Sequence, residues 1–261
     1  MRITTIINGK GGVGKTTTTH AMSTGLNKRG LSTLAVDYDP QGNLSLAFGA
    51  DVSNHPTMYH VIVGEASFDE AIQHTTQGNI IAGNSSLSKM DTQYHGDTLL
   101  DGITRLKEEL NRLSDQYDYI FIDNQPLIGG LLTMQSLVAA NDLVVPLSAD
   151  VFAVQGLVKL QEATERIKKI YNPNLMIDGL LLTKHNPRTV ISGQMSENLN
   201  KWAGTFNSRV YKTFIREGVA VREAQLKKQS VFDYAPTSNP AQDYIEFINE
   251  YVDQGELKHA N

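Results

Sequence analysis

The sequence predicts an α/β fold in which a mostly parallel sheet is flanked by helices, within a single domain of residues 1–261. Short runs rich in isoleucine, valine and leucine alternate along the chain with segments whose apolar residues recur at helical spacing. The length of 261 residues suits one large core, and no proline- or glycine-rich linker marks a domain boundary. Such alternation is typical of βαβ units, which join parallel strands through right-handed crossovers.

Six short apolar runs are the predicted strands, because strands buried on both faces of a sheet carry continuous rather than alternating apolar residues. In chain order, the runs are residues 2–8, 31–37, 79–83, 118–123, 142–147 and 176–183. The fourth run is the most apolar, and it ends in Asp123. We therefore expect this carboxylate at the carboxyl end of a buried strand.

Four segments are predicted helices, since their apolar residues recur every three or four positions. They are residues 15–29, 96–113, 155–170 and 240–252. The first begins directly after glycines and ends before Gly30, and the second carries a stripe of leucine and isoleucine. Together with the strands, these helices predict a sheet that is covered on both sides.

The composition is that of an ordinary globular protein, with 40% hydrophobic and 20% charged residues. No cationic start is followed by an apolar segment, and no run approaches about 18 apolar residues. We therefore expect neither a signal peptide nor a membrane span, and a cytoplasmic location. Cysteine is absent, which excludes sites held by thiolates, such as iron–sulfur clusters and structural zinc sites.

Charge is divided unevenly along the chain, although the net charge is only −5. Residues 184–229 carry nine lysines and arginines against three acids, a local balance of +6, whereas the remainder has a balance of −11. A basic segment of this kind is a candidate for binding the phosphate backbone of DNA. A solvated face is the alternative, and the steep salt dependence of DNA contacts distinguishes the two.

A glycine-rich stretch, NGKGGVGKT at residues 8–16, joins the first predicted strand to the first predicted helix. It satisfies the pattern G-x-x-x-x-G-K-[ST], in which loop N–H groups and the helix N-terminus bind phosphates. Lys15 is expected to pair with the β and γ phosphates of a nucleotide, Thr16 to ligate Mg²⁺, and Thr17 to reach the α phosphate. The residues expected to bind the nucleotide are Gly9, Lys10, Gly11, Gly12, Val13, Gly14, Lys15, Thr16 and Thr17.

Two acidic residues complete the predicted site. A P-loop needs an acid at the end of another strand to hold the water shell of the metal, and Asp123 has this place. Asp39, in VDYDPQGN at residues 36–43, follows the second strand at the edge of the sheet where ligands bind. It is expected to orient the water that attacks the γ phosphate or to accept its proton, with turn formation as an alternative role. Thr16, Asp39 and Asp123 are thus the candidate metal site.

The motif KGGVGKTT, with Lys10 before the paired glycines, and the motif DYDPQGN resemble those of the deviant Walker A ATPases of the ParA/Soj/MinD group. YIFID and residues 179–189 and 231–244 match as well, so the resemblance covers nearly the whole chain. It implies a P-loop NTPase fold and the conversion of ATP and water to ADP and phosphate. It also implies a homodimer that encloses ATP, in which Lys10 crosses the interface to the partner's nucleotide. The implied catalytic residues are Lys10, Lys15, Asp39 and Asp123.

The chain departs from the pattern of this group at two places. Asn124 and Gln125 precede a single proline after the strand that ends in the acid, where relatives have two prolines in this loop, which senses the γ phosphate. Arg216 and Gly218 stand where relatives have a proline and an asparagine that shape the adenine pocket. The first departure bears on the rate of hydrolysis and the second on the contacts with the base.

The resemblance also implies DNA contacts in the basic segment. Arg188 matches a position that relatives use for DNA, and Arg222 lies two places after Ala220, on which a second such arginine falls. The candidate DNA-binding residues are Arg188, Lys201, Arg216, Arg222, Lys227 and Lys228.

Cofactor and anchoring signals separate the branches of the group. Iron–sulfur relatives need cysteine ligands, which this chain lacks. MinD-like proteins end in a basic amphipathic helix, whereas residues 246–261 here are acidic and poorly amphipathic. These signals favour the ParA/Soj branch, which partitions plasmids or chromosomes, and argue against membrane binding.

Membership of that branch implies a nucleoid-associated ATPase that dimerises with ATP and binds nonspecific double-stranded DNA. Slow hydrolysis, stimulated by a ParB-type centromere-binding protein, would reset the cycle. The alternatives are a MinD-like membrane-associated regulator of cell division and a P-loop small-molecule kinase or ligase.

Overall fold

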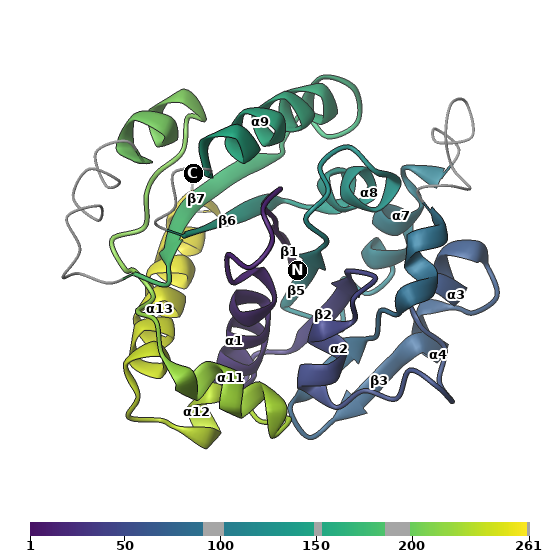
Figure 1. Ribbon diagram of the computed structural model, residues 1–261. Coiled ribbons are helices and arrows are strands. Elements are labelled where there is room, and N and C mark those ends of the chain that lie inside the picture. The colour runs from purple at the N-terminus through teal and green to yellow at the C-terminus, as the bar shows by residue number, and fades with distance from the viewer. Residues whose placement is uncertain (91–101, 149–152, 186–198, 260–261) are drawn as a thin grey trace.

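The computed structural model describes residues 1–90, 102–148, 153–185 and 199–259. Its strands form one seven-stranded sheet in the order β3-β4-β2-β5-β1-β6-β7, with helices on both faces (Figure 1). Neighbouring strands run parallel except β3 and β4, so the predicted fold class is confirmed. The strands are β1 (Arg2–Ile6), β2 (Thr33–Tyr38), β3 (Ile72–Thr75), β4 (Gly78–Ile81), β5 (Tyr119–Asn124), β6 (Asp142–Ser148) and β7 (Met176–Thr183).

Helices connect the strands and cover the sheet. In the described residues they are α1 (Lys15–Asn27), α2 (Asn43–Phe48), α3 (Met58–Val63), α4 (Phe68–Ala71), the 3-10 helix η1 (Ser85–Lys89), α7 (Arg105–Asn111), α8 (Leu131–Ala139), α9 (Ala153–Ile170), α11 (Val219–Leu226), α12 (Val231–Tyr234) and α13 (Asn239–His259). In this part of the chain, no helix combines the length and the apolar character that a membrane crossing requires.

The predicted helix at residues 96–113 is only partly confirmed. In its described part, residues 103–104 form a turn and α7 begins at Arg105, while residues 91–101 lie outside the described residues. The other three predicted helices correspond to α1, α9 and α13. α13 extends past the predicted end at residue 252, to His259.

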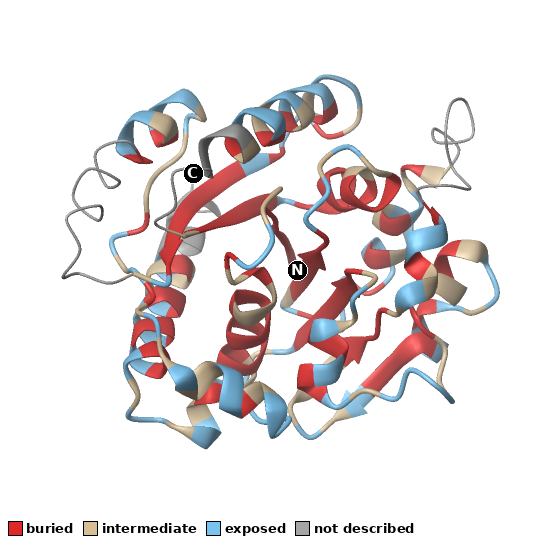
Figure 2. Cartoon of the chain, viewed as in Figure 1, coloured by how far each residue is buried: buried red, intermediate tan, exposed pale blue. Residues whose placement is uncertain are grey.

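The central strand β5 shows why the apolar runs predict strands so well. Ile120 and Ile122 pack into the core beneath α7 and α8, whereas Phe121 packs into the core beneath α1 and α13. Side chains alternate between the two faces of a strand, so a strand covered on both sides needs apolar residues at every position. Figure 2 shows the central strands of the sheet as almost continuously buried.

No apolar run predicts β3, the edge strand of the sheet. Its four residues pair antiparallel with β4, and its exposure rises from the buried Ile72 to the exposed His74. The turn between the two strands leads into Gly78, whose φ of 129° favours glycine. A short strand that is half exposed carries too few apolar residues to be read from the sequence.

Helix α13 holds α1, and with it the glycine-rich loop that precedes α1. The two helices approach closely at Gly25, where a Cβ atom would lie 2.5 Å from Ile248 Cδ1 and 3.1 Å from Phe232 Cε2. Tyr244, Phe247 and Ile248 of α13 belong to the same core as Met22 and Leu26 of α1. The glycine therefore permits a close contact between α13 and the carboxyl-terminal half of α1.

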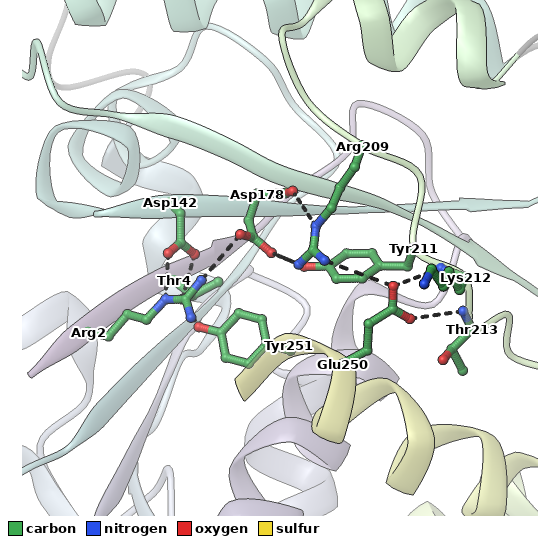
Figure 3. A network of polar contacts seen from close by, with 10 residues as sticks. All are labelled: Arg2, Thr4, Asp142, Asp178, Arg209, Tyr211, Lys212, Thr213, Glu250 and Tyr251. Atoms are coloured by element: carbon green, nitrogen blue, oxygen red, sulfur yellow. Dashed lines mark hydrogen bonds and ion pairs between the residues drawn. The ribbon is translucent and has the colours of Figure 1, made fainter. Parts of the chain in front are cut away.

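A buried polar network lies at the amino-terminal ends of β1, β6 and β7, at the far end of β1 from the loop (Figure 3). Arg2 Nε donates to Asp142 Oδ2 at 2.6 Å, and Arg2 Nη2 lies 3.5 Å from Asp178 Oδ1. Arg209 Nη2 lies 2.8 Å from Asp178 Oδ2. The guanidinium of Arg2 stands 4.0 Å from the centre of the Tyr251 ring. These contacts join α13 and the segment around residue 209 to the sheet.

Candidate nucleotide-binding site

The phosphate loop, residues 8–14, follows β1 and leads into α1. Asn8 anchors its beginning, because Nδ2 donates to the carbonyl of Pro146 on β6 at 2.8 Å and Oδ1 accepts from the N–H of Lys10 at 2.9 Å. Thr183 of β7 anchors its end through a 2.7 Å hydrogen bond from Oγ1 to the carbonyl of Val13. Contacts with two neighbouring strands therefore hold the shape of the loop.

Glycines give the loop an open outer side. Gly12 and Gly14 have φ angles of 73° and 86°, in the left-handed region that favours glycine. A Cβ atom at Gly11 or Gly12 would meet no atom within 4 Å, whereas one at Gly9 would lie 3.0 Å from Ile128 Cγ1. The space next to the loop also receives the N–H groups at the start of α1. This arrangement fits the phosphates of a nucleotide.

Lys15, the first residue of α1, is the buried cation of the site. Its Nζ donates to the carbonyl of Lys10 at 3.0 Å, so the side chain folds back over the loop. Burial lowers the pKa of Lys15, and the carboxylates of Asp123 and Asp39 oppose this shift. An anion at the loop would stabilise the ammonium form further. Lys10 itself is half-buried.

Thr16 and Asp123 lie together, as a metal site requires. Thr16 Oγ1 donates to Asp123 Oδ2 at 2.7 Å, and Thr19 Oγ1 donates to Asp123 Oδ1 at 3.3 Å. Burial and the neighbouring carboxylate of Asp37 raise the pKa of Asp123 well above its usual range. These oxygen atoms suit Mg²⁺, which takes few protein ligands and keeps phosphate and water ligands. Across the described residues, no three His, Asp or Glu side chains are grouped to hold a metal by themselves.

Asp37 belongs to this acidic set, although it is not among the predicted residues. It is fully buried on β2, in register with Asp123 on β5. Its Oδ2 accepts hydrogen bonds from Ser45, at 2.8 Å from the N–H and 2.6 Å from Oγ. Burial raises the pKa of Asp37 to about 6. The sequence signal for Asp37 is its place at the end of an apolar run, but only the strand order pairs it with Asp123.

Asp39 lies in the turn after β2, beside the same pocket. Its Oδ1 accepts from the N–H of Gln41 at 2.9 Å, which is the turn contact that was the alternative role. The carboxylates of Asp39 and Asp123 both act on the charge of Lys15, so the three residues lie close together. The structure thus assembles the set, while the chemical role of Asp39 stays a prediction.

A pocket of about 650 Å³ extends from the phosphate loop to α2 and α11. Its volume and mixed lining are typical of sites for small molecules. At the far end the apolar lining residues are Leu46, Ala47, Val221 and Leu226. Gln225 of α11 lines it too, and its Nε2 donates to Thr17 Oγ1 at 3.3 Å. No motif near the loop could indicate these residues, because most of them lie about 200 positions away in the chain.

The candidate DNA-binding residues lie in different surroundings. Lys201, Lys227 and Lys228 are exposed, and Arg222 is exposed at the rim of the pocket. Arg188 lies outside the described residues. Their contacts with DNA stay predictions.

Arg216, another of these candidates, lines the pocket and is held by Asp243. Its Nη2 lies 2.5 Å from Asp243 Oδ1, and its Nε lies 3.0 Å from both carboxylate oxygens. The backbone N–H of Arg216 donates to Asp243 Oδ2 at 2.8 Å. This ion pair sets the position of the guanidinium beside the pocket. A DNA contact by Arg216 stays a prediction.

Comparison with known proteins agrees with the geometry of the site. The family model described as an AAA domain matches residues 1–177. The sporulation initiation inhibitor protein Soj of Bacillus subtilis is 32% identical over 255 residues, which cover 97% of this chain and 99% of Soj. The chromosome partitioning protein ParA of Caulobacter vibrioides is 32% identical over 265 residues, which cover 100% of this chain and 97% of ParA.

Solved structures share the fold over almost the full length. Cobyrinic acid a,c-diamide synthase from Mycobacterium smegmatis, with a bound ATP analog and magnesium, has a TM-score of 0.78 and 25% identity, covering 98% of this chain and 96% of that chain. The septum site-determining protein MinD from Pyrococcus horikoshii, complexed with Mg-ADP, has a TM-score of 0.76 and 26% identity, covering 98% of both chains. The chain therefore belongs to the ParA/Soj family of partitioning ATPases, with a P-loop fold.

Proposed function

We propose that the protein is a ParA-type ATPase that partitions a plasmid or a chromosome. Two copies close around ATP and Mg²⁺, the closed homodimer binds double-stranded DNA without sequence preference on the nucleoid, and slow hydrolysis opens it. A ParB-type centromere-binding protein stimulates that hydrolysis. The observation that carries the proposal is an open phosphate loop with a second lysine, Lys10, next to the assembled Lys15, Asp39 and Asp123.

Each residue of the site has a distinct task in this function. Lys15 and the N–H groups of the loop bind the β and γ phosphates and stabilise the negative charge of the transition state. Thr16 and Asp123, which lie together, would hold the metal ion, and the ion would neutralise further phosphate charge. Asp39, beside the pocket, orients the attacking water and accepts its proton.

Lys10 supplies positive charge that one phosphate loop lacks. Its backbone is fixed at both polar groups, since its N–H donates to Asn8 and its carbonyl accepts from Lys15. The loop therefore sets the direction in which its side chain leaves. A triphosphate enclosed between two subunits loses hydration, and an ammonium from the second subunit compensates through charge-assisted hydrogen bonds.

Replacing the two lysines separately tests this proposal. Lys15→Ala is expected to abolish nucleotide binding, because it removes the buried ammonium. Lys10→Ala is expected to bind one nucleotide per monomer and to lose the ATP-dependent dimer, measured by titration with a fluorescent nucleotide and by sedimentation velocity. Lys169 is an exposed lysine on α9, and Lys169→Ala serves as the control that keeps both nucleotide binding and the ATP-dependent dimer. Full ATP-dependent dimerisation of Lys10→Ala would contradict the role of Lys10.

The two alternative functions make different predictions. A MinD-like regulator would sediment with liposomes in the presence of ATP, whereas the acidic residues 246–253 disfavour an anionic membrane. A small-molecule kinase or ligase would release ADP only when its acceptor is added. Neither alternative uses a homodimer that acquires DNA affinity with ATP.

A further inference from the structure

Two glutamines join α1, which begins at the phosphate loop, to the basic end of α11. Gln225 Nε2 donates to Thr17 Oγ1 at 3.3 Å. Gln77 lies in the turn between β3 and β4. Its Oε1 lies 2.8 Å from Nε2 of His20, and its own Nε2 donates to the carbonyl of Lys228 at 2.9 Å. The last turn of α11 and the residues directly after it are thus both connected to α1.

The spacing of Thr17 and His20 explains how both links form at once. The two residues are three positions apart on α1, so they lie on one face of that helix. Gln225 lies in the last turn of α11, and Lys228 follows two residues after the helix ends at Leu226. The first turns of α1 are therefore linked both to the last turn of α11 and to the basic residues that follow it.

The link through Gln77 is a fixed one. Burial lowers the pKa of His20 to about 4, so its ring is neutral near pH 7, and its Nε2–H donates to Gln77 Oε1. Gln77 Nε2 also donates to the carbonyl of Ala47 at 2.5 Å. Lys228 has a φ of 54°, which is unusual for a residue other than glycine. Its side chain packs on Gly49, where an added Cβ atom would lie 3.3 Å from Lys228 Cδ. The backbone of the basic turn is held in one conformation.

The link through Gln225 differs because it lies in the nucleotide pocket. Both Gln225 and Thr17 line that pocket, and both are half-buried. Their 3.3 Å hydrogen bond is long for such a pair. Thr17 is the residue expected to reach the α phosphate. Its hydroxyl would donate to that phosphate and still accept from Gln225, so a bound nucleotide would fix the hydroxyl that Gln225 contacts. The nucleotide state thus changes the contact of α11 with α1 only two residues before Lys227.

We propose that Gln225 is a positioning residue that couples the nucleotide state of the phosphate loop to the basic turn of Lys227 and Lys228. The proposal rests on the proposed function and adds the connection between its two sites. A ligand shifts a distant site only through contacts that differ between two states, and the Gln225–Thr17 hydrogen bond is such a contact. Gln77 keeps the turn attached to α1 while α11 adjusts.

The test compares DNA affinity with and without nucleotide in three proteins: wild type, Gln225→Ala, and Gln229→Ala. Gln229 is an exposed glutamine of the same segment and serves as the matched control. Each protein is titrated onto a fluorescent DNA duplex of random sequence, without nucleotide and with a saturating non-hydrolysable ATP analogue. Saturation removes the effect of any change in nucleotide affinity. The readout is the ratio of the two dissociation constants, which loss of folded protein alone does not change.

Wild type and Gln229→Ala are expected to show the same ratio, and Gln225→Ala a ratio at least about fivefold smaller. Hydrogen exchange gives a second readout that needs no DNA: the analogue is expected to change exchange at residues 225–229 in wild type but not in Gln225→Ala. If Gln225→Ala showed the same ratio of dissociation constants and the same changes in hydrogen exchange as wild type, the coupling would be overturned and the proposed function would stand. A wild-type protein whose DNA affinity ignores nucleotide would overturn both.

Discussion

His20 is the single residue whose environment most clearly predicts a dependence of stability on pH. Its ring is buried between Gln77 and Phe48, and burial lowers its pKa to about 4, from an ordinary value of about 6.5. The unfolded chain therefore binds the proton first, so stability is complete above pH 6.5 and is lost as the pH falls towards 4. The loss attributable to His20 is of order 3 kcal/mol.

Urea unfolding between pH 7.5 and pH 4.5, with His20→Gln beside wild type, measures this contribution. The glutamine keeps a polar group towards Gln77 and cannot titrate, so the variant is expected to lose less stability over this interval. Equal losses in the two proteins would show that His20 does not carry the effect.

Replacement of Asp39 is expected to change the rate of ATP turnover rather than the stability of the fold. Asp39→Ala is expected to lower ATP hydrolysis by about 100-fold or more, because it removes the group that we propose as the acceptor of the proton from water. Dimers with ATP should then persist and stay on DNA. Phosphate release and DNA retention measure the two effects, with Glu65→Ala as an exposed acidic control. Unchanged turnover would remove Asp39 from the mechanism.

Single residues of the site differ in how far the sequence predicts them. Lys15, Thr16 and Asp123 are predictable because a local pattern and a strand end fix their chemistry and place. Asp37 and Gln225 are not, since their roles depend on which strand and which distant helix lie beside them. A local sequence pattern carries no information on such neighbours.

Among the elements, α13 and the strands it covers depend on the buried network of Figure 3. Asp178 is fully buried there and pairs with Arg2 and Arg209. Asp178→Ala is expected to lower the free energy of unfolding by about 3–5 kcal/mol, because it leaves cationic groups without their carboxylate in the interior. Lys28→Ala, which breaks an exposed ion pair with Asp233, is expected to cost at most about 1 kcal/mol.

Urea unfolding at pH 7.5 compares these two variants with wild type. A similar, small loss of unfolding free energy in both variants would contradict the view that the network holds α13 against the sheet. The network leaves the phosphate loop untouched, so nucleotide affinity of the folded Asp178→Ala protein should remain measurable.

The elements that the sequence predicts best are those buried on both faces. β1, β5 and β7 are found within two residues of their predicted bounds, because burial on both faces favours apolar residues at most of their positions. The edge strand β3 and the short helices α2, α11 and α12 escape prediction, since solvent covers one side of them and their apolar pattern is brief. α2 and α11 are nevertheless the elements that close the far end of the pocket.

For the whole molecule, the separation of charge is the property that matters most to function. Residues 184–229 hold a balance of +6 against −11 for the remainder, so only part of the surface attracts a polyanion. In the proposed closed dimer, two such segments would meet one DNA duplex, and two weak contacts on one body bind far more tightly than one. Closure by ATP would thus raise DNA affinity without a new binding site, in addition to the coupling proposed for Gln225.

DNA binding in three nucleotide states tests this central claim most directly. Dissociation constants for a random-sequence duplex are measured with ATP, with ADP and without nucleotide. Each measurement is made at about 50 mM and at about 200 mM salt. We predict tight binding with ATP alone, weakened by about 10³-fold or more at the higher salt if six phosphates are contacted. Equal affinity in all three states, or an affinity that salt does not change, would contradict the account.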